Sequence, residues 1–435
     1  MCALTLVAGY LLKDQCVGTV LPHTVSYDGS QYRHSCYSDI YVLYFWRGLA
    51  YERLPYIHGN GELLDERAGQ TNIEIGDLEY PLGTGLVMAL VAEFSHDAAG
   101  FFAGTGSVLA LCGLLALLAM IPMVRDRRRL FYYAAAPSLI LYAFHNWDLV
   151  AVAFVCAALL AFHRRRDVWS GALLGIGAAT KLFPGLILPA LVLARAKQDK
   201  RFPWPMLGSA AASFVALNLP FAIANRAGWW FPWKFQSARG PNIDDVWNFF
   251  QRHFGGASSI FSSDNVPKTA NVVSIGIFIV FGGLLLAREA RRDEVRPYAT
   301  SFALLLLFLI PAKVFSPQYA LWLLPFFVLV EIPWYLFAAF AISEAAVWFT
   351  VSGYLITIQY HVGDGPFRLA LTEIAVFVRA AVLLVLLAYS LFARENVGDL
   401  VPDDAPTIQE PRSLDAGAAG LRRACSGAHE EREGT

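Results

Sequence analysis

The chain has 435 residues and a net charge of −1; 56% of its residues are hydrophobic and only 16% are charged. Soluble domains carry about 25% charged residues, so this composition excludes an ordinary soluble protein. Many of the apolar residues lie in runs whose length is close to the roughly 20 residues that a helix needs to cross a bilayer. We therefore predict an all-α polytopic membrane protein. No nucleic-acid partner is expected, and the near-neutral charge does not identify another partner.

The first apolar run, residues 2–12, ends at Lys13 and is too short to span a membrane alone. It indicates either a start further upstream or a short helix that tilts against its neighbours. A polar loop follows over 13–99 and contains Cys16 and Cys36. If this loop faces an oxidising exterior, a disulfide between the two is expected; the alternative is two unpaired thiols.

Asp39 heads an aromatic stretch that is typical of an amphipathic helix, CYSDIYVLYFWRGLAYERLPY. Either Ser38 or Asp39 could cap that helix, because both side chains accept hydrogen bonds from the first turn. The other interpretation is that Asp39 is a catalytic base at the membrane surface. A second run, 80–95, is expected to lie on the membrane as the partner of this helix, since a crossing there would move the Asp39 loop to the cytoplasmic side.

Basic clusters predict the topology, because the positive-inside rule places them in the cytoplasm. They lie at 125–129, 164–166, 195–201 and 288–296. The chain must cross the membrane an even number of times between clusters, so the run 170–195 has to form two short arms. Pro184 favours a break near 180–184, because proline removes a helix hydrogen bond. Lys181 then lies at an outer turn, where its charge costs less than it would in lipid.

This topology gives a GT-C-like arrangement of about twelve transmembrane helices with both termini in the cytoplasm. The segments are 2–12, 100–124, 130–144, 147–162, two arms in 170–195, 204–224, 271–288, 298–312, 317–331, 333–353 and 369–392. The membrane domain covers 1–393; its first external loop, 13–99, holds the two juxtamembrane helices, and 225–270 is a second large external loop. Residues 394–435 are polar and poor in aromatics, which predicts a disordered cytoplasmic tail.

Polar side chains gather at the external face in this topology, and several such groups at a membrane edge suggest a shared cavity. The candidate site residues are Asp39, Glu79, Tyr80, Asn146, Asp148, Lys181, Lys313, Gln318 and Tyr319. Simpler roles remain open: Asp148 could cap a helix, Glu79 could be a solvated helix start, and Lys181 could extend to lipid headgroups. No zinc, phosphate-loop or G-x-S-x-G pattern is apparent, so no cofactor is expected, and a divalent metal is left open.

An external site has no ready access to cytoplasmic ATP or nucleotide sugars. A lipid phosphate solves this problem, because its activated headgroup is presented at the outer leaflet. The chemistry then needs a carboxylate that accepts a proton, for which Asp39 is suited. It also needs a cation or metal at the leaving phosphate, for which we expect Lys181 and, as a second candidate, Lys313.

Five stretches of the chain resemble the GT-C superfamily of membrane glycosyltransferases, in particular glycosyltransferase family 87. They are CYSDI with RGLAYERLPY, LEYPLGTGL, NWDLVAVA, GALLGIGAATKLFPGLILPALVLA and SPQYALWLLPF, and they span roughly residues 36–330. Each is weak alone, but five in this order are fairly specific. The short first span and a glycine within LEYPLGTG depart from the family pattern.

The resemblance implies that Asp39 is the catalytic base and that two juxtamembrane helices follow it. It also implies transfer of a sugar, with mannose expected, from a polyprenyl phosphate to a lipid or glycan acceptor at the outer face of the plasma membrane, with inversion. Asp148 and Gln318 would shape the pocket. The alternatives are a membrane transporter or lipid flippase, which would also need charges at the membrane edge, and a non-catalytic scaffold.

Overall fold

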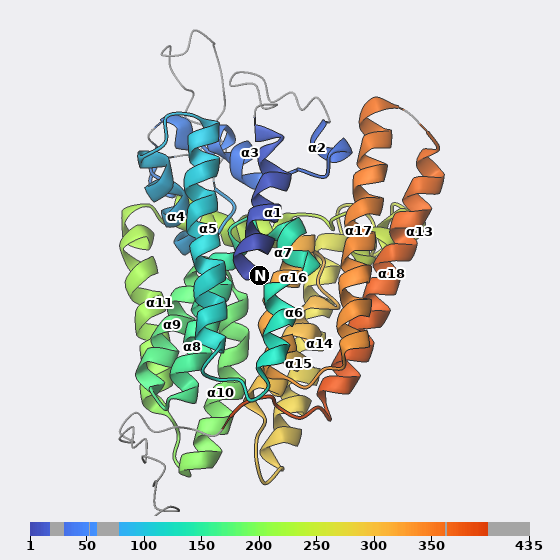
Figure 1. Cartoon of the computed structure of the whole chain (residues 1–435). Coiled ribbons are helices and arrows are strands. Elements are labelled where there is room, and N and C mark those ends of the chain that lie inside the picture. Colours follow the sequence, from blue (N-terminus) through green and yellow to red (C-terminus); the bar gives the residue numbers. More distant parts are fainter. Residues whose placement is uncertain (18–29, 52, 59–77, 362, 399–435) are drawn as a thin grey trace, which may run out of the picture. The chain divides into compact units, whose positions relative to one another are not determined.

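The computed structural model describes residues 1–17, 30–51, 53–58, 78–361 and 363–398 (Figure 1). In these ranges the regular secondary structure is helical, apart from two isolated β-bridges that join Val124 to Val397 and Val330 to Glu395. The described residues belong to one compact unit, Met1–Gly398. The prediction of an all-α polytopic membrane protein is confirmed.

The helices of the first half of the chain are α1 (Cys2–Asp14), α2 (Ser30–Arg33), α3 (Asp39–Trp46), η2 (Leu49–Tyr51), α4 (Leu82–Glu93), α5 (Ala98–Met120), η3 (Arg127–Leu130), α6 (Phe131–Ala134), α7 (Pro137–Tyr142), α8 (Asp148–His163), α9 (Asp167–Thr180) and α10 (Phe183–Asp199). Those of the second half are α11 (Trp204–Ala224), α12 (Arg226–Ala238), α13 (Val246–Phe254), α14 (Val266–Ala290), α15 (Pro297–Leu309), η4 (Pro317–Tyr319), α16 (Ala320–Leu329), α17 (Trp334–Tyr360) and α18 (Gly365–Ser390).

Five helices of the described part are long and apolar enough to cross a membrane: α5, α11, α14, α17 and α18. Shorter apolar helices lie at 82–93, 148–163, 297–309 and 317–329. Two segments differ from what the sequence predicts. The run 130–144 is divided into α6 and α7, because Pro137 starts a new helix as its first residue. The 225–270 loop contains two helices, α12 and α13, which the sequence analysis did not predict.

The expected break within 170–195 is present. α9 ends at Thr180, α10 begins at Phe183, and Pro184 lies in the first turn of α10. Proline is tolerated there because the first N–H groups of a helix have no partner within it. Lys181 occupies the break in an extended conformation, so its side chain leaves the helical path of both neighbours.

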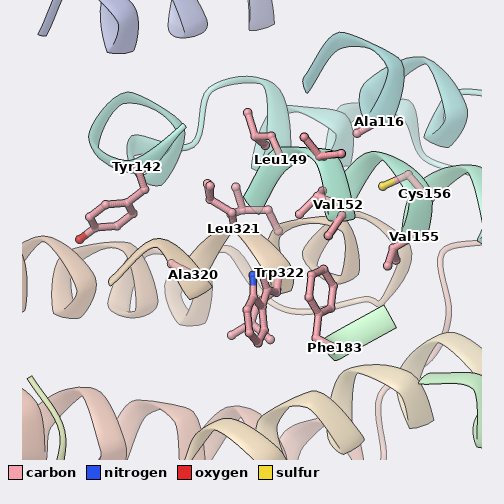
Figure 2. Packing of buried hydrophobic residues seen from close by; sticks show 14 of the residues in the cluster. Ala116, Tyr142, Leu149, Val152, Val155, Cys156, Phe183, Ala320, Leu321 and Trp322 are labelled. Atoms are coloured by element: carbon pink, nitrogen blue, oxygen red, sulfur yellow. The ribbon is translucent and has the colours of Figure 1, made fainter. Parts of the chain in front are cut away.

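The core is formed by short helices that are apolar all round. All ten residues of α16 are buried, as are most residues of α8 and α15. Figure 2 shows how Leu149 and Val152 of α8 face Leu321 and Trp322 of α16, with Phe183 of α10 against Trp322. α11 and α14 instead expose apolar side chains such as Ile223 and Ile279, as a lipid-facing helix does. The buried short helices therefore form a fixed centre within the longer ones.

Two glycines allow α9 and α11 to touch backbone to backbone. A Cβ atom on Gly171 would lie 2.0 Å from the carbonyl oxygen of Met206, and one on Gly175 would lie 2.2 Å from that of Ala210. Small residues four apart are the usual means of close helix packing in membranes. Any side chain at these positions would force the two helices apart.

The chain after α18 packs against the end of the bundle. The backbone N–H of Glu331 donates to the carbonyl of Arg394, and Asn396 donates to the carbonyls of Val328 and Asp126. Residues 394–398 are thus part of the compact unit, although the predicted tail begins at 394. The remainder of that predicted tail, 399–435, lies outside the described residues.

Candidate active site

Ser38, and not the carboxylate of Asp39, supplies the side-chain bond at the start of α3. The Ser38 hydroxyl accepts a hydrogen bond from the N–H of Ile40 at 3.2 Å and donates to the carbonyl of Phe144 at 2.7 Å. The Asp39 N–H donates to the carbonyl of His145 at 2.9 Å. These bonds attach the start of α3 to the turn before α8, and they leave the Asp39 carboxylate available for other partners.

Three neutral donors hold the Asp39 carboxylate. Tyr37 donates its hydroxyl hydrogen to Oδ1 at 2.7 Å, and Tyr80 donates to Oδ2 at 2.9 Å. The amide of Asn146 lies 3.0 Å from the same Oδ2 and 2.6 Å from the Tyr80 oxygen. Asp39 itself is partly exposed. The arrangement therefore orients a carboxylate that remains partly exposed to solvent.

Burial shifts the pKa of Tyr80 and of His145, two residues close to Asp39. Burial, with the negative charges of Asp39 and Glu79, raises the pKa of Tyr80 well above its ordinary value. His145, next to Asn146, is buried beside the positive charge of Lys13, and both effects hold its pKa well below its ordinary value. Tyr80 is therefore a constant donor to Asp39, and the imidazole of His145 is neutral.

A buried ion pair lies next to this carboxylate. Asp148, the first residue of α8, is fully buried; Trp322 donates its indole hydrogen to Oδ1 at 2.7 Å, and the ammonium of Lys181 lies 3.3 Å from Oδ2. Lys181 is the residue that ends α9: its N–H still donates to the carbonyl of Gly177 at 2.9 Å, but its extended conformation turns the chain out of the helix at this point. Removal of either charge would leave the other buried without its ion partner.

Aromatic rings connect the ion pair to Asp39. The Lys181 ammonium lies 5.0 Å from the ring centre of Tyr80 and 5.6 Å from that of Tyr319, distances typical of cation–π contacts. Tyr319 stacks on Trp322 at 3.9 Å, and Trp322 stacks on Phe183 at 4.4 Å. Tyr80 thus touches both the Asp39 carboxylate and the Lys181 ammonium.

Two predicted site residues, Glu79 and Lys313, have other close partners, and a third, Gln318, is buried. Glu79 forms a two-pronged ion pair with Arg47, at 2.6 and 2.9 Å. Lys313 donates to the carbonyl of Ser237 at 2.9 Å, and burial, with the nearby charge of Arg239, lowers its pKa to about 8. Gln318 is buried in η4, and its side-chain oxygen accepts no hydrogen bond within the described part of the chain.

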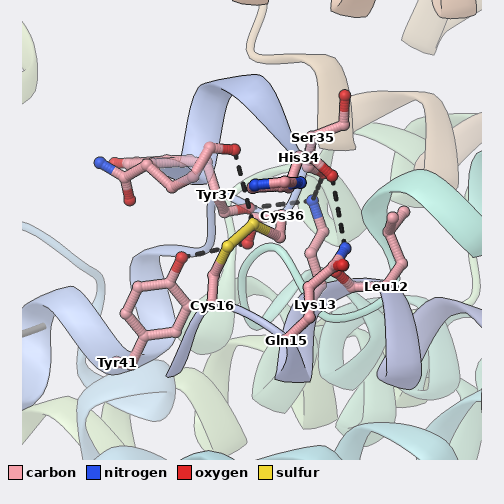
Figure 3. Close-up of a disulfide and its surroundings, with 10 residues drawn as sticks. Leu12, Lys13, Gln15, Cys16, His34, Ser35, Cys36, Tyr37 and Tyr41 are labelled. Atoms are coloured by element: carbon pink, nitrogen blue, oxygen red, sulfur yellow. Dashed lines mark hydrogen bonds between the residues drawn. A yellow bond between two sulfur atoms is a disulfide. The ribbon is translucent and has the colours of Figure 1, made fainter. Parts of the chain in front are cut away.

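The disulfide between Cys16 and Cys36 is present, with a Cα–Cα distance of 5.9 Å (Figure 3). It joins the chain after α1 to the segment that leads into α3. Cys36 lies three residues before Asp39, so the predicted covalent link is close to the candidate base. In the described ranges no three His, Cys, Asp or Glu side chains form a group able to hold a metal ion.

Sequence reasoning missed three contributors to the site: Tyr37, Lys13 and Trp322. Tyr37 could have been found from its place in CYSDI, two residues before Asp39. Lys13 was treated only as the end of an apolar run. Trp322 had no local signal, because its bond to Asp148 joins residues 174 positions apart.

The fold and these contacts define an integral membrane protein with a polar site of carboxylates, tyrosines and a lysine among its helices. The model of glycosyltransferase family 87 matches residues 78–317, more than half of the chain, and the chain therefore belongs to this family. It is a membrane glycosyltransferase. The match includes Tyr80, Asn146, Asp148 and Lys181, whereas Asp39 lies before it. No curated protein matches the chain.

Proposed function

We propose that this glycosyltransferase moves a hexose, mannose in our assignment, from a polyprenyl-phosphate donor to a lipid or glycan acceptor at the outer face of the plasma membrane. The family supports sugar transfer, and the apolar helices support a membrane-embedded donor. A lipid-linked sugar needs no soluble nucleotide-sugar domain, since its headgroup meets the enzyme at the membrane surface.

The observation that carries the proposal is the fixed, partly exposed carboxylate of Asp39. Asp39 accepts the proton of the acceptor hydroxyl as its oxygen attacks the anomeric carbon of the sugar. The bond from that carbon to the phosphate oxygen breaks, and the polyprenyl phosphate leaves with the bonding electrons. Attack from the side opposite the phosphate inverts the anomeric configuration. Tyr37, Tyr80 and Asn146 keep the carboxylate in the required direction throughout.

Lys181 is the cation that we assign to the donor phosphate. Its ammonium contacts the ring of Tyr80, and the hydroxyl of that ring binds Asp39. The residue assigned to the proton and the residue assigned to the phosphate are therefore neighbours. Asp148 and Trp322 hold the ammonium in place, and a positioned cation stabilises the charge that develops on a leaving phosphate. We assign Tyr319 and Gln318 to the walls of this pocket and Glu79 to its rim, with Lys313 as a second cation.

The external location rests on the distribution of charge along the bundle. α2 and α3, which precede and carry Asp39, lie at one end of the unit, and the turn between α14 and α15 lies at the other end (Figure 1). That turn holds part of the basic cluster 288–296. With the basic end in the cytoplasm, Asp39 would face outward, and we assign both termini to the cytoplasm by the same rule.

The test is transfer of radiolabelled mannose from polyprenyl-phosphate mannose to acceptors in isolated membranes. We expect Asp39→Asn to lower the rate by about 10²–10⁴-fold, the range that general base catalysis contributes. Asp264→Asn is the matched control, because Asp264 is exposed and far from these contacts in the chain. Near-normal transfer by the purified, folded Asp39→Asn protein contradicts the assignment of the base.

A further inference from the structure

Lys13 lies in the last turn of α1, a largely apolar helix that ends at Asp14, and its side chain is fully buried. Burial of an ammonium is costly unless its hydrogens and its charge are compensated. In the described residues no carboxylate lies within ion-pair distance of it. The groups that do surround Lys13 therefore indicate what the residue is for.

The Lys13 ammonium binds backbone on both sides of Cys36. It donates to the carbonyl of Tyr37 at 2.9 Å and to that of Ser35 at 3.3 Å (Figure 3). It also lies 4.3 Å from the ring centre of Trp348 in α17. A charged donor to two carbonyls is a strong, directional attachment. Lys13 thus fastens the segment 35–37 to the end of α1.

This attachment fixes the position of residues that contact Asp39, the candidate base. Tyr37, whose carbonyl Lys13 binds, donates through its hydroxyl to Oδ1 of Asp39. The Tyr37 ring also packs on His145 at 5.3 Å, and the His145 carbonyl receives the Asp39 N–H. A shift of the Tyr37 backbone would therefore move both the side-chain donor and the start of α3.

The charge of Lys13 also interacts with the Asp39 carboxylate. Burial lowers the pKa of Lys13 to about 7, and the negative charge of Asp39 opposes this shift by favouring the ammonium form. The three hydrogen-bond donors to the Asp39 carboxylate, by contrast, are neutral. Lys13 consequently combines a geometric link to Asp39 with a compensating charge beside it.

We propose that Lys13 is a positioning residue for Asp39, which holds the base-bearing segment 35–39 against α1 and α17 together with the Cys16–Cys36 disulfide. This inference rests on the proposed role of Asp39. Lys13 is fully buried, so we expect its loss to act on the rate of the chemical step more than on substrate binding.

Two substitutions separate this role from simple packing. Lys13→Met keeps the length and apolar stem but loses the charge and donors, whereas Lys13→Arg keeps both. With polyprenyl-phosphate mannose as donor, we expect kcat of Lys13→Met to fall by about 10²-fold, the effect of a displacement of about 1 Å at a reacting group, while KM stays within a factor of about two. Lys13→Arg should recover most of kcat. The exposed Lys268→Met is the control.

A second measurement does not depend on turnover. Hydrogen–deuterium exchange should quicken in the segment 35–39 of Lys13→Met and remain unchanged in α8. Unchanged kcat and unchanged exchange in Lys13→Met overturn the inference, and so does an equal loss in Lys13→Arg. If Asp39→Asn retains activity, the proposed function fails instead, and the exchange result still reports whether Lys13 fastens the segment.

Discussion

The Tyr80 hydroxyl donates a 2.9 Å hydrogen bond to Oδ2 of Asp39. The ring that carries this hydroxyl also contacts the ammonium of Lys181. One side chain therefore joins the group assigned to the acceptor proton and the group assigned to the donor phosphate. In the proposed reaction the acceptor oxygen and the phosphate lie on opposite sides of the anomeric carbon, and Tyr80 contacts the two residues that we assign to them.

Tyr80→Phe removes the hydroxyl and keeps the ring. The Asp39 carboxylate then loses one of three donors, and a hydrogen bond to a charged group contributes about 1.5–3 kcal/mol, so we expect kcat to fall by about 10–100-fold. KM for the donor should change little, because the ring still faces Lys181. Initial rates of labelled-sugar transfer measure both. Tyr335→Phe, on an exposed side chain, serves as the control, and wild-type rates in Tyr80→Phe would contradict the orienting role.

For the Asp148–Lys181 pair we expect that a second substitution restores part of the stability that the first one removes. Lys181→Met leaves the fully buried Asp148 carboxylate without its counter-ion, which costs about 3–5 kcal/mol in comparable buried pairs. Asp148→Asn removes the stranded charge. The double variant should therefore unfold at a higher temperature than Lys181→Met alone, as measured by thermal unfolding in detergent.

The same double variant remains inactive if Lys181 serves the donor phosphate. Recovery of stability together with recovery of transfer would show that the pair is only structural. Equal unfolding temperatures for the single and double variants would show that the buried charge is compensated by other groups.

Lys313 gives the stability of the protein a defined pH dependence. Its pKa is lowered to about 8 in the fold, from an ordinary value of 10.5, first by burial and then by Arg239. The unfolded chain therefore binds more protons than the folded chain between these values, and stability rises as the pH increases from about 8 to 10.5. Below pH 8 both states are protonated and the cost of the buried charge is fully present.

Lys313→Met should make this rise smaller without abolishing it, because burial also lowers the pKa of Lys13, to about 7. The measurement is the thermal midpoint at pH 7.5 and at pH 10 for the wild type and the variant, with Lys268→Met as the exposed control. An increase of equal size in the wild type and in Lys313→Met would assign the pH dependence to another group.

The disulfide predicts a change in thiol count and in stability. Alkylation of the denatured protein should label two more cysteines after reduction than before, and Cys16→Ser should abolish the difference. The bond closes a loop of about 20 residues, for which the chain-entropy model gives a stabilisation of about 3 kcal/mol. Cys112→Ser, on a cysteine outside the bond, is the control. The same unfolding temperature in Cys16→Ser and the wild type would contradict the stabilising role.

The sequence predicted those features that depend on local pattern or on charge parity. The break near Lys181 followed from the basic clusters and Pro184, and the Cys16–Cys36 bond followed from two cysteines in one polar loop. α12 and α13 were missed because their aromatic and polar residues give no continuous apolar run. The partner of Asp148 was missed because Trp322 meets it only through the packing of α8 against α16, which no spacing along the chain reveals.

The close contact of α9 with α11 limits how a long hydrocarbon tail enters the protein. Gly171 and Gly175 bring these two backbones so near that not even a methyl group fits between them. At these two positions no prenyl or acyl chain can therefore pass between α9 and α11. Lys181 lies directly after α9, so the lipid-linked donor that we propose would have to approach the lysine from a side other than this contact.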